Sequence, residues 1–201
     1  MIASADLAAE MRASVAALTL SDAETLCDLG VPAGAIDLFQ LIGRAAIRVE
    51  GELFQPDPDG LPAFVTPVLC HSPVTPESPW PGSYCRLGAL VDLVAWHPAH
   101  SQRWALRTGA AAWLGCIPVQ FAELAPEPVP IWRSPLTWLR ADSVGLALLT
   151  RDRGEGFSVL SGITGGIVAE DEAHAAELRA LLRRPFPIPR VAVGREARCA
   201  A

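Results

Sequence analysis

The sequence contains no lysine and no asparagine, so arginine supplies all 16 of its basic side chains. Without lysine there is no P-loop lysine to bind phosphate, no lysine Schiff base and no lysine general base. Without asparagine, helix caps and turns depend on glycine, aspartate and serine. The abundance of arginine, alanine, glycine and proline indicates the composition bias of a genome rich in G and C.

The chain also lacks an apolar run of the ~18 residues that a membrane span requires, since proline interrupts its longest uncharged runs, 61–76 and 108–122. It begins without the basic stretch of a secretion signal. Its net charge of −6 argues against bulk electrostatic binding to nucleic acid or an anionic membrane. We expect a soluble, cytoplasmic protein that does not engage membranes and whose five cysteines are reduced.

Hydrophobic residues make up 51% of the 201 residues and charged residues only 19%, which is typical of a globular protein with a substantial core. The pattern predicts an acidic helical segment over residues 1–42, an α+β domain over 43–194 and a disordered tail over 195–201. The expected fold class is α+β, with N-terminal helices followed by a mixed, largely antiparallel sheet that has helices mainly on one face.

The spacing at which hydrophobic residues recur distinguishes the expected helices from the expected strands. Spacings of three and four residues, with caps at Ser21 and Ser134, predict helices at 7–18, 21–30, 35–41, 109–114, 136–141 and 171–184. Alternation and short apolar runs predict strands at 45–53, 63–69, 87–97, 103–108, 129–133, 144–150, 157–161, 166–169 and 190–194. The sequence Asp-Pro-Asp-Gly at 57–60 predicts a tight turn.

Asp92 is a carboxylate within an otherwise apolar predicted strand, where a catalytic or metal-binding acid would also be found. A hairpin centred on Ala99 and His100 would place Asp92 opposite Arg107 on the neighbouring strand. We therefore expect a structural ion pair between the Asp92 and Arg107 side chains, with a catalytic or metal-binding Asp92 as the alternative.

Side chains that zinc prefers occur within a short stretch, namely Cys70, His71, Cys85, His97 and His100. No pair among them has the C-x2-C spacing by which a zinc site is recognised from sequence. We expect no metal and no other cofactor, and we expect Cys70 and Cys85 to be small buried apolar groups.

Glu170, Asp171 and Glu172 follow a predicted strand and open a predicted helix, a position where α/β proteins often bind nucleotides or metals. Acids in the first turn of a helix also offset its dipole, which explains them without a site. Glu170 is therefore a catalytic candidate only as the alternative. His174, in the same turn, is expected to be a solvated helix residue.

Tryptophan and arginine are both favoured where proteins bind one another. Of the six tryptophans, Trp80 is expected to be exposed, because it lies in a proline-rich connection. From Arg179 onward the sequence has six arginines and one acid, and this reversal of charge makes Arg183 and Arg184 further binding candidates.

Four segments carry a family resemblance: LVDLVAWHP at 90–98, RWALRTG at 103–109, SPLTWLR at 134–140 and AEDEAHA at 169–175. Over about residues 85–185 the chain resembles short hypothetical bacterial proteins of the prophage-borne kind. The resemblance implies no catalytic or binding residues. It implies an accessory role beside phage-type replication genes.

The function expected from these observations is that of a non-enzymatic accessory protein that acts by protein binding or self-association. Its partners are then another protein or a second copy of the chain. One alternative is a metal-dependent hydrolase or nuclease-like enzyme that uses Asp92, His97, His100 and Glu170. A second alternative is a nucleic-acid accessory protein of a phage-type replication module that binds through the arginine-rich end.

Overall fold

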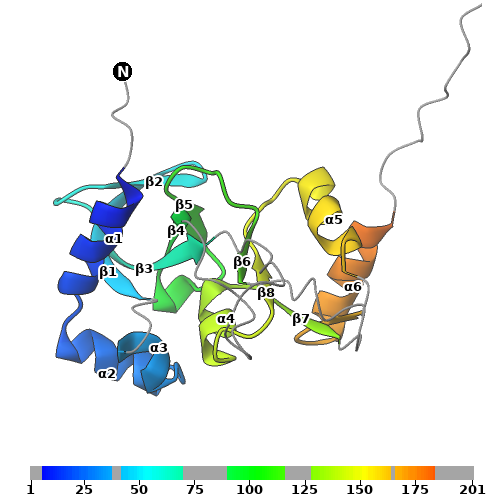
Figure 1. Cartoon of the computed structure of the whole chain (residues 1–201), viewed down its shortest axis with the longest axis horizontal. Helices are drawn as coiled ribbons and strands as arrows, with labels where there is room; N and C mark the ends of the chain where they lie inside the picture. Colours follow the sequence, from blue (N-terminus) through cyan, green and yellow to red (C-terminus); the bar gives the residue numbers. More distant parts are fainter. Residues whose placement is uncertain (1–5, 38–41, 70–89, 116–127, 164–165, 184–201) are drawn as a thin grey trace, which may run out of the picture.

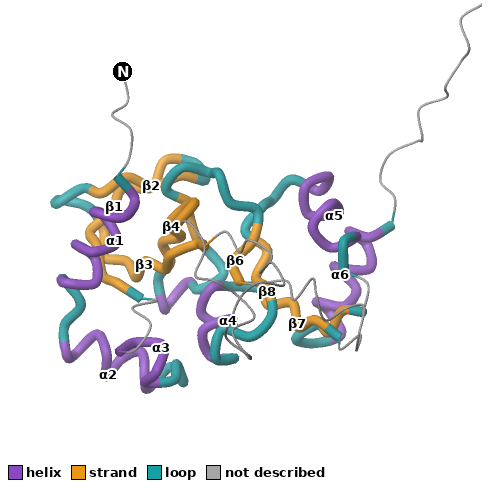
Figure 2. Tube along the Cα trace, in the orientation of Figure 1, coloured by secondary structure: helices purple, strands orange, loops and turns teal. Residues whose placement is uncertain are grey.

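The computed structural model describes residues 6–37, 42–69, 90–115, 128–163 and 166–183. Its α+β class confirms the prediction, but the strands form two sheets rather than one. Figure 1 shows N-terminal helices beside a barrel, followed by a second sheet and the C-terminal helices. In Figure 2 the strands occupy the middle of the molecule and most helices lie at its two ends.

The N-terminal segment forms three helices, α1 (Leu7–Ala16), α2 (Leu20–Asp28) and α3 (Ala33–Asp37). The cap of the second helix lies two residues before the predicted one, because Thr19 and Asp22 make the capping box in place of a cap at Ser21. Gly30, with a φ of +84°, follows its end as predicted.

Five strands close into a barrel in the order β1-β2-β5-β4-β3. They are β1 (Gly43–Glu50), β2 (Leu53–Pro56), β3 (Leu61–Leu69), β4 (Leu90–Trp96) and β5 (Trp104–Leu106). Neighbouring strands are antiparallel except for β2 and β5, which are parallel. The single strand predicted over 45–53 is two strands, because the chain turns at Gly51, whose φ is +66°. The predicted turn at 57–60 is confirmed.

Helix α1 packs against one end of the barrel. Its Met11 side chain shares a hydrophobic cluster with the side chains that alternate into the barrel, among them Phe54, Val65 and Leu93. The contact is close where β1 begins, since a Cβ on Gly43 would lie 2.6 Å from the Ser14 side chain. One end of the barrel is therefore filled by a helix.

The second sheet has the order β6-β8-β7-β9. Its strands are β6 (Trp113–Gly115), β8 (Leu146–Leu148), β7 (Val129–Trp132) and β9 (Ile167–Val168). Three helices accompany it, α4 (Pro135–Arg140), α5 (Arg153–Ser161) and α6 (Glu172–Leu182). The caps at Ser134 and Asp171 confirm the predicted starts of α4 and α6, and β8 pairs on both sides as a central strand.

Two predicted elements are wrong. The strand predicted over 157–161 belongs to α5, which begins where the Asp152 side chain accepts the backbone N–H of Glu155 at 2.8 Å. The helical turn predicted over 109–114 is largely an irregular connection that enters β6, flanked by Gly109 and Gly115 at positive φ. The strand predicted over 190–194 lies outside the described residues.

Three hydrophobic clusters hold these parts together. The largest joins Leu26 of α2, Trp96 of β4 and Trp138 of α4, so the acidic helices, the barrel and the second sheet share one core. Among the residues that the structure describes, no helix is long and apolar enough to cross a membrane.

Candidate functional site

Asp92 is fully buried, and its carboxylate is surrounded by backbone N–H groups. Oδ1 accepts hydrogen bonds from the amides of Leu93, Arg107 and Thr108 at 2.8, 3.1 and 2.9 Å. Oδ2 accepts the amide of Ala110 at 2.8 Å. With both oxygens accepting backbone N–H groups, Asp92 holds the connection after β5 in place.

The predicted ion pair between Asp92 and Arg107 is wrong. The hairpin pairs Ala95 with Ala105 and Trp96 with Trp104, which is one residue away from the predicted register. A shift of the strand register by one residue places each side chain on the opposite face of the sheet from the predicted one. The Arg107 guanidinium instead binds the Glu10 carboxylate of α1, with N···O distances of 2.8 and 3.0 Å.

His97 and His100 are exposed at the other end of β4, around the 3₁₀ turn Pro98–His100. Their ring centroids are 6.2 Å apart, and Nδ1 of His97 accepts the Ala99 amide at 3.2 Å. Asp92 and His97 are five residues apart on an extended strand, a separation of about 16 Å. The structure therefore does not bring these candidates together.

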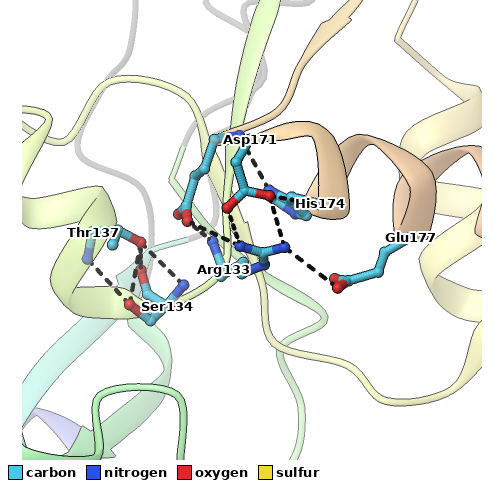
Figure 3. A network of polar contacts seen from close by, with 7 residues as sticks. Arg133, Ser134, Thr137, Asp171, His174 and Glu177 are labelled. Carbon is cyan, nitrogen blue, oxygen red and sulfur yellow. Dashed lines mark hydrogen bonds and ion pairs between the residues drawn. The ribbon is translucent and has the colours of Figure 1, made fainter.

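Glu170 belongs to an ion-pair network centred on Arg133, at the end of β7. Figure 3 shows Arg133 in this network with Asp171 and Glu177. Oε1 of Glu170 accepts the backbone N–H of Arg133 at 2.7 Å. The guanidinium of Arg133 binds Asp171 through two hydrogen bonds and reaches Glu177 at 3.3 Å. The hydrogen bonds that Arg133 donates to Asp171 raise the pKa of Arg133 and lower the pKa of Asp171. This network fastens the first turns of α6 to the second sheet.

His174 is buried, with 4% of its surface exposed, so the prediction of a solvated residue is wrong. Its Nδ1 accepts the backbone N–H of Glu170 at 3.3 Å, and its own backbone N–H is capped by Asp171. Burial, and after it the charge of Arg133, lower the pKa of His174 against the opposing effect of nearby carboxylates.

Five other candidates lie outside the described residues, namely Cys70, His71, Trp80, Cys85 and Arg184. Arg183 is exposed at the C-terminal cap of α6. Within the described part of the chain, no group of three histidine, cysteine, aspartate or glutamate side chains is placed to hold a metal ion.

A hollow opens at the mouth of the barrel, at the end opposite α1. It is a cavity of about 790 Å³, within the usual range for ligand sites. Three small side chains on neighbouring strands, Ala63, Ala95 and Ala105, line it on the barrel side. The sequence offered no signal for it, because isolated alanines in strands carry no pattern.

Apolar and cationic groups surround this barrel mouth, which we define by the residues Val49, Leu61, His97, His100, Arg103, Trp104 and Arg151. Val49 and Leu61 are 52% and 77% exposed, an unusual degree of exposure for such side chains. The Arg151 guanidinium lies 5.5 Å from the centre of the Trp104 ring and 3.4 Å from Glu52. The apolar side chains thus stand next to cations in a chain whose net charge is −6.

No family model, no curated protein and no solved structure matches this chain. The role of the barrel mouth therefore rests on its own residues.

Proposed function

We propose that the chain is a non-enzymatic binding protein whose barrel mouth takes an acidic segment of a partner protein. The observation that carries the proposal is an open hollow with apolar walls and a cationic rim on an otherwise acidic chain. An apolar anchor side chain of the partner would fill the space above the three alanines. Carboxylates beside that anchor would meet the rim cations.

The rim is suited to carboxylates more than to a phosphate backbone. Arg103 has no ion-pair partner among the described residues, whereas the charge of Arg151 is shared with Glu52. The exposed carboxylates of Glu50 and Glu52 next to the mouth interrupt its basic surface. An acidic peptide needs only two or three cations, while a nucleic acid needs a continuous basic track.

The metal-dependent hydrolase has less support. It needs Asp92, His97, His100 and Glu170 to converge. Asp92 is occupied by four backbone amides and Glu170 by the backbone of Arg133, while the two histidines lie at the barrel mouth.

The experiment is fluorescence anisotropy on the full chain with a labelled peptide, Glu-Asp-Phe-Leu-Asp-Glu. Two further peptides replace the acids with lysines or the Phe-Leu pair with alanines. We expect saturable binding of the first peptide only. Leu61→Ser and Arg103→Glu should each weaken it at least tenfold, which corresponds to about 1.4 kcal/mol.

Leu20→Ser is the matched control, since Leu20 is 78% exposed, as Leu61 is at 77%, but does not line the mouth. It should leave the affinity unchanged. Equal binding of the lysine peptide, or an affinity indifferent to Leu61→Ser, would overturn the proposal. Failure of every peptide to bind, with dimers in sedimentation velocity that Leu61→Ser dissociates, would replace it with self-association through the same surface.

A further inference from the structure

A second cavity, of about 450 Å³, lies between the second sheet and the two C-terminal helices. Its apolar wall includes Trp132 of β7, Leu148 of β8 and Leu181 of α6. Four polar side chains also line it, namely Arg133, Arg153, His174 and Glu177, and the guanidinium of Arg133 is already paired with carboxylates. An apolar pocket with a few polar groups is the usual form of a small-molecule site.

The imidazole of His174 presents a hydrogen-bond donor to this cavity. Its Nδ1 accepts the Glu170 amide, so the hydrogen of the neutral ring is on Nε2. No acceptor for Nε2 occurs among the described residues, although His174 is only 4% exposed and lines the cavity. Nε2 is not among the buried atoms that lack a partner in the described part of the chain, so its N–H is open to the cavity and can donate to a ligand that supplies an acceptor.

Arg153 and Glu177 add opposite charges. One N–H group of the Arg153 guanidinium donates to the backbone oxygen of Ala180 at 3.1 Å. The guanidinium has four further N–H groups that do not take part in this hydrogen bond. One Glu177 oxygen contacts Arg133 at 3.3 Å, and the other has no described partner. Since Ala180 is three residues beyond Glu177, the contact of Arg153 and the side chain of Glu177 start from the same face of α6, about one helical turn apart along the backbone.

We propose that this cavity binds a free apolar α-amino acid. The carboxylate of the ligand would accept hydrogen bonds from Arg153 and from Nε2–H of His174, and its ammonium would donate to Glu177. The ligand side chain would lie against Trp132, Leu148 and Leu181. A simple anion fits less well, because three carboxylates already surround Arg133 nearby. This site is independent of the barrel mouth.

Isothermal titration of the full chain with L-phenylalanine tests the site. Two analogues separate the charges: phenethylamine lacks the carboxylate, and 3-phenylpropionate lacks the ammonium. We expect saturable binding of L-phenylalanine and of L-leucine, with each analogue at least tenfold weaker.

Arg153→Met and Glu177→Gln should each weaken binding of L-phenylalanine at least tenfold, and both residues are exposed enough for the fold to survive the change. Arg179→Met is the control. Arg179 is an exposed arginine of α6, the helix that carries Glu177, and it pairs with Glu172 outside the cavity. Equal binding of either analogue, no saturable binding of L-phenylalanine at millimolar concentration, or unchanged affinity in both cavity variants would overturn the assignment.

Discussion

Replacing Asp92 perturbs the most fully satisfied polar group of the barrel. Its carboxylate accepts the amides of Leu93, Arg107, Thr108 and Ala110, and it is fully buried. Asparagine keeps an oxygen for the first three donors but turns an NH₂ group toward the Ala110 amide. Leaving a buried donor of this kind unsatisfied costs about 1–3 kcal/mol, and the cost is lower where water reaches the donor.

Alanine at position 92 removes every acceptor. The Leu93 amide is buried, whereas the amides of Thr108 and Ala110 belong to exposed residues that water can reach. We therefore expect Asp92→Ala to lower the free energy of unfolding by about 2–5 kcal/mol, and Asp92→Asn by less. Urea unfolding followed by tryptophan fluorescence measures both. Asp59→Asn, at an exposed turn position, should stay within about 0.5 kcal/mol of the wild type.

A double-mutant cycle separates the observed arrangement from an ion pair. Arg107 contributes its backbone to Asp92 and its side chain to Glu10, so Arg107→Gln removes only the second contact. We expect a coupling of about 1 kcal/mol between Glu10→Gln and Arg107→Gln, and additivity between Asp92→Asn and Arg107→Gln. Coupling of the second pair, or an Asp92→Asn variant as stable as the wild type, would refute this reasoning.

The remaining predictions concern the second half of the chain. Leu178→Ala should cost about 2–5 kcal/mol in urea unfolding, because Leu178 is buried against β7, β8 and α5; an unchanged midpoint would contradict this packing. Gly145→Ala should unfold at lower temperature, because Gly145 has a φ of +84° and a Cβ would collide with the Pro130 carbonyl oxygen. Burial lowers the pKa of His174, so the unfolded chain takes up this proton first as the pH falls below about 6.5, and stability is lost through that window. His174→Gln should remove this part of the pH dependence between pH 7 and 5, and stability curves that stay parallel to the wild type would exclude it.

Local signals explain what the sequence predicted well. Ser134 followed by proline and the acids before α6 mark helix starts through bonds made within three or four residues. The Asp-Pro-Asp-Gly turn at 57–60 is equally local. Such interactions form wherever the residues occur, so they can be recognised without a fold.

The register of the β4–β5 hairpin and the partner of Arg107 could not be predicted from local sequence, because both depend on the whole fold. The loop between Trp96 and Trp104 contains a 3₁₀ turn, and a change of one residue in its centre moves Arg107 to the other face. The partner of Arg107 is Glu10, which is 97 residues away in the sequence. Barrel closure likewise depends on the parallel contact of Leu53 with Leu106.

The two candidate sites could not be recognised from the sequence for a similar reason. Ala63, Ala95 and Ala105 make a hollow only because three strands bring them together. His174 was predicted to be a solvated helix residue, but the rest of the fold buries it near Arg133, which follows β7.

The most direct test of the barrel mouth is a ¹H–¹⁵N spectrum of the full chain titrated with the Glu-Asp-Phe-Leu-Asp-Glu peptide. The indole N–H signals report on the tryptophans one by one. We predict that the signal of Trp104 shifts together with the backbone amides of Arg103 and Ala105, while that of Trp113, which is 37% exposed on the second sheet, stays in place. A Trp104 signal that does not move at saturating peptide, or a shift confined to Trp113, would contradict binding at the barrel mouth.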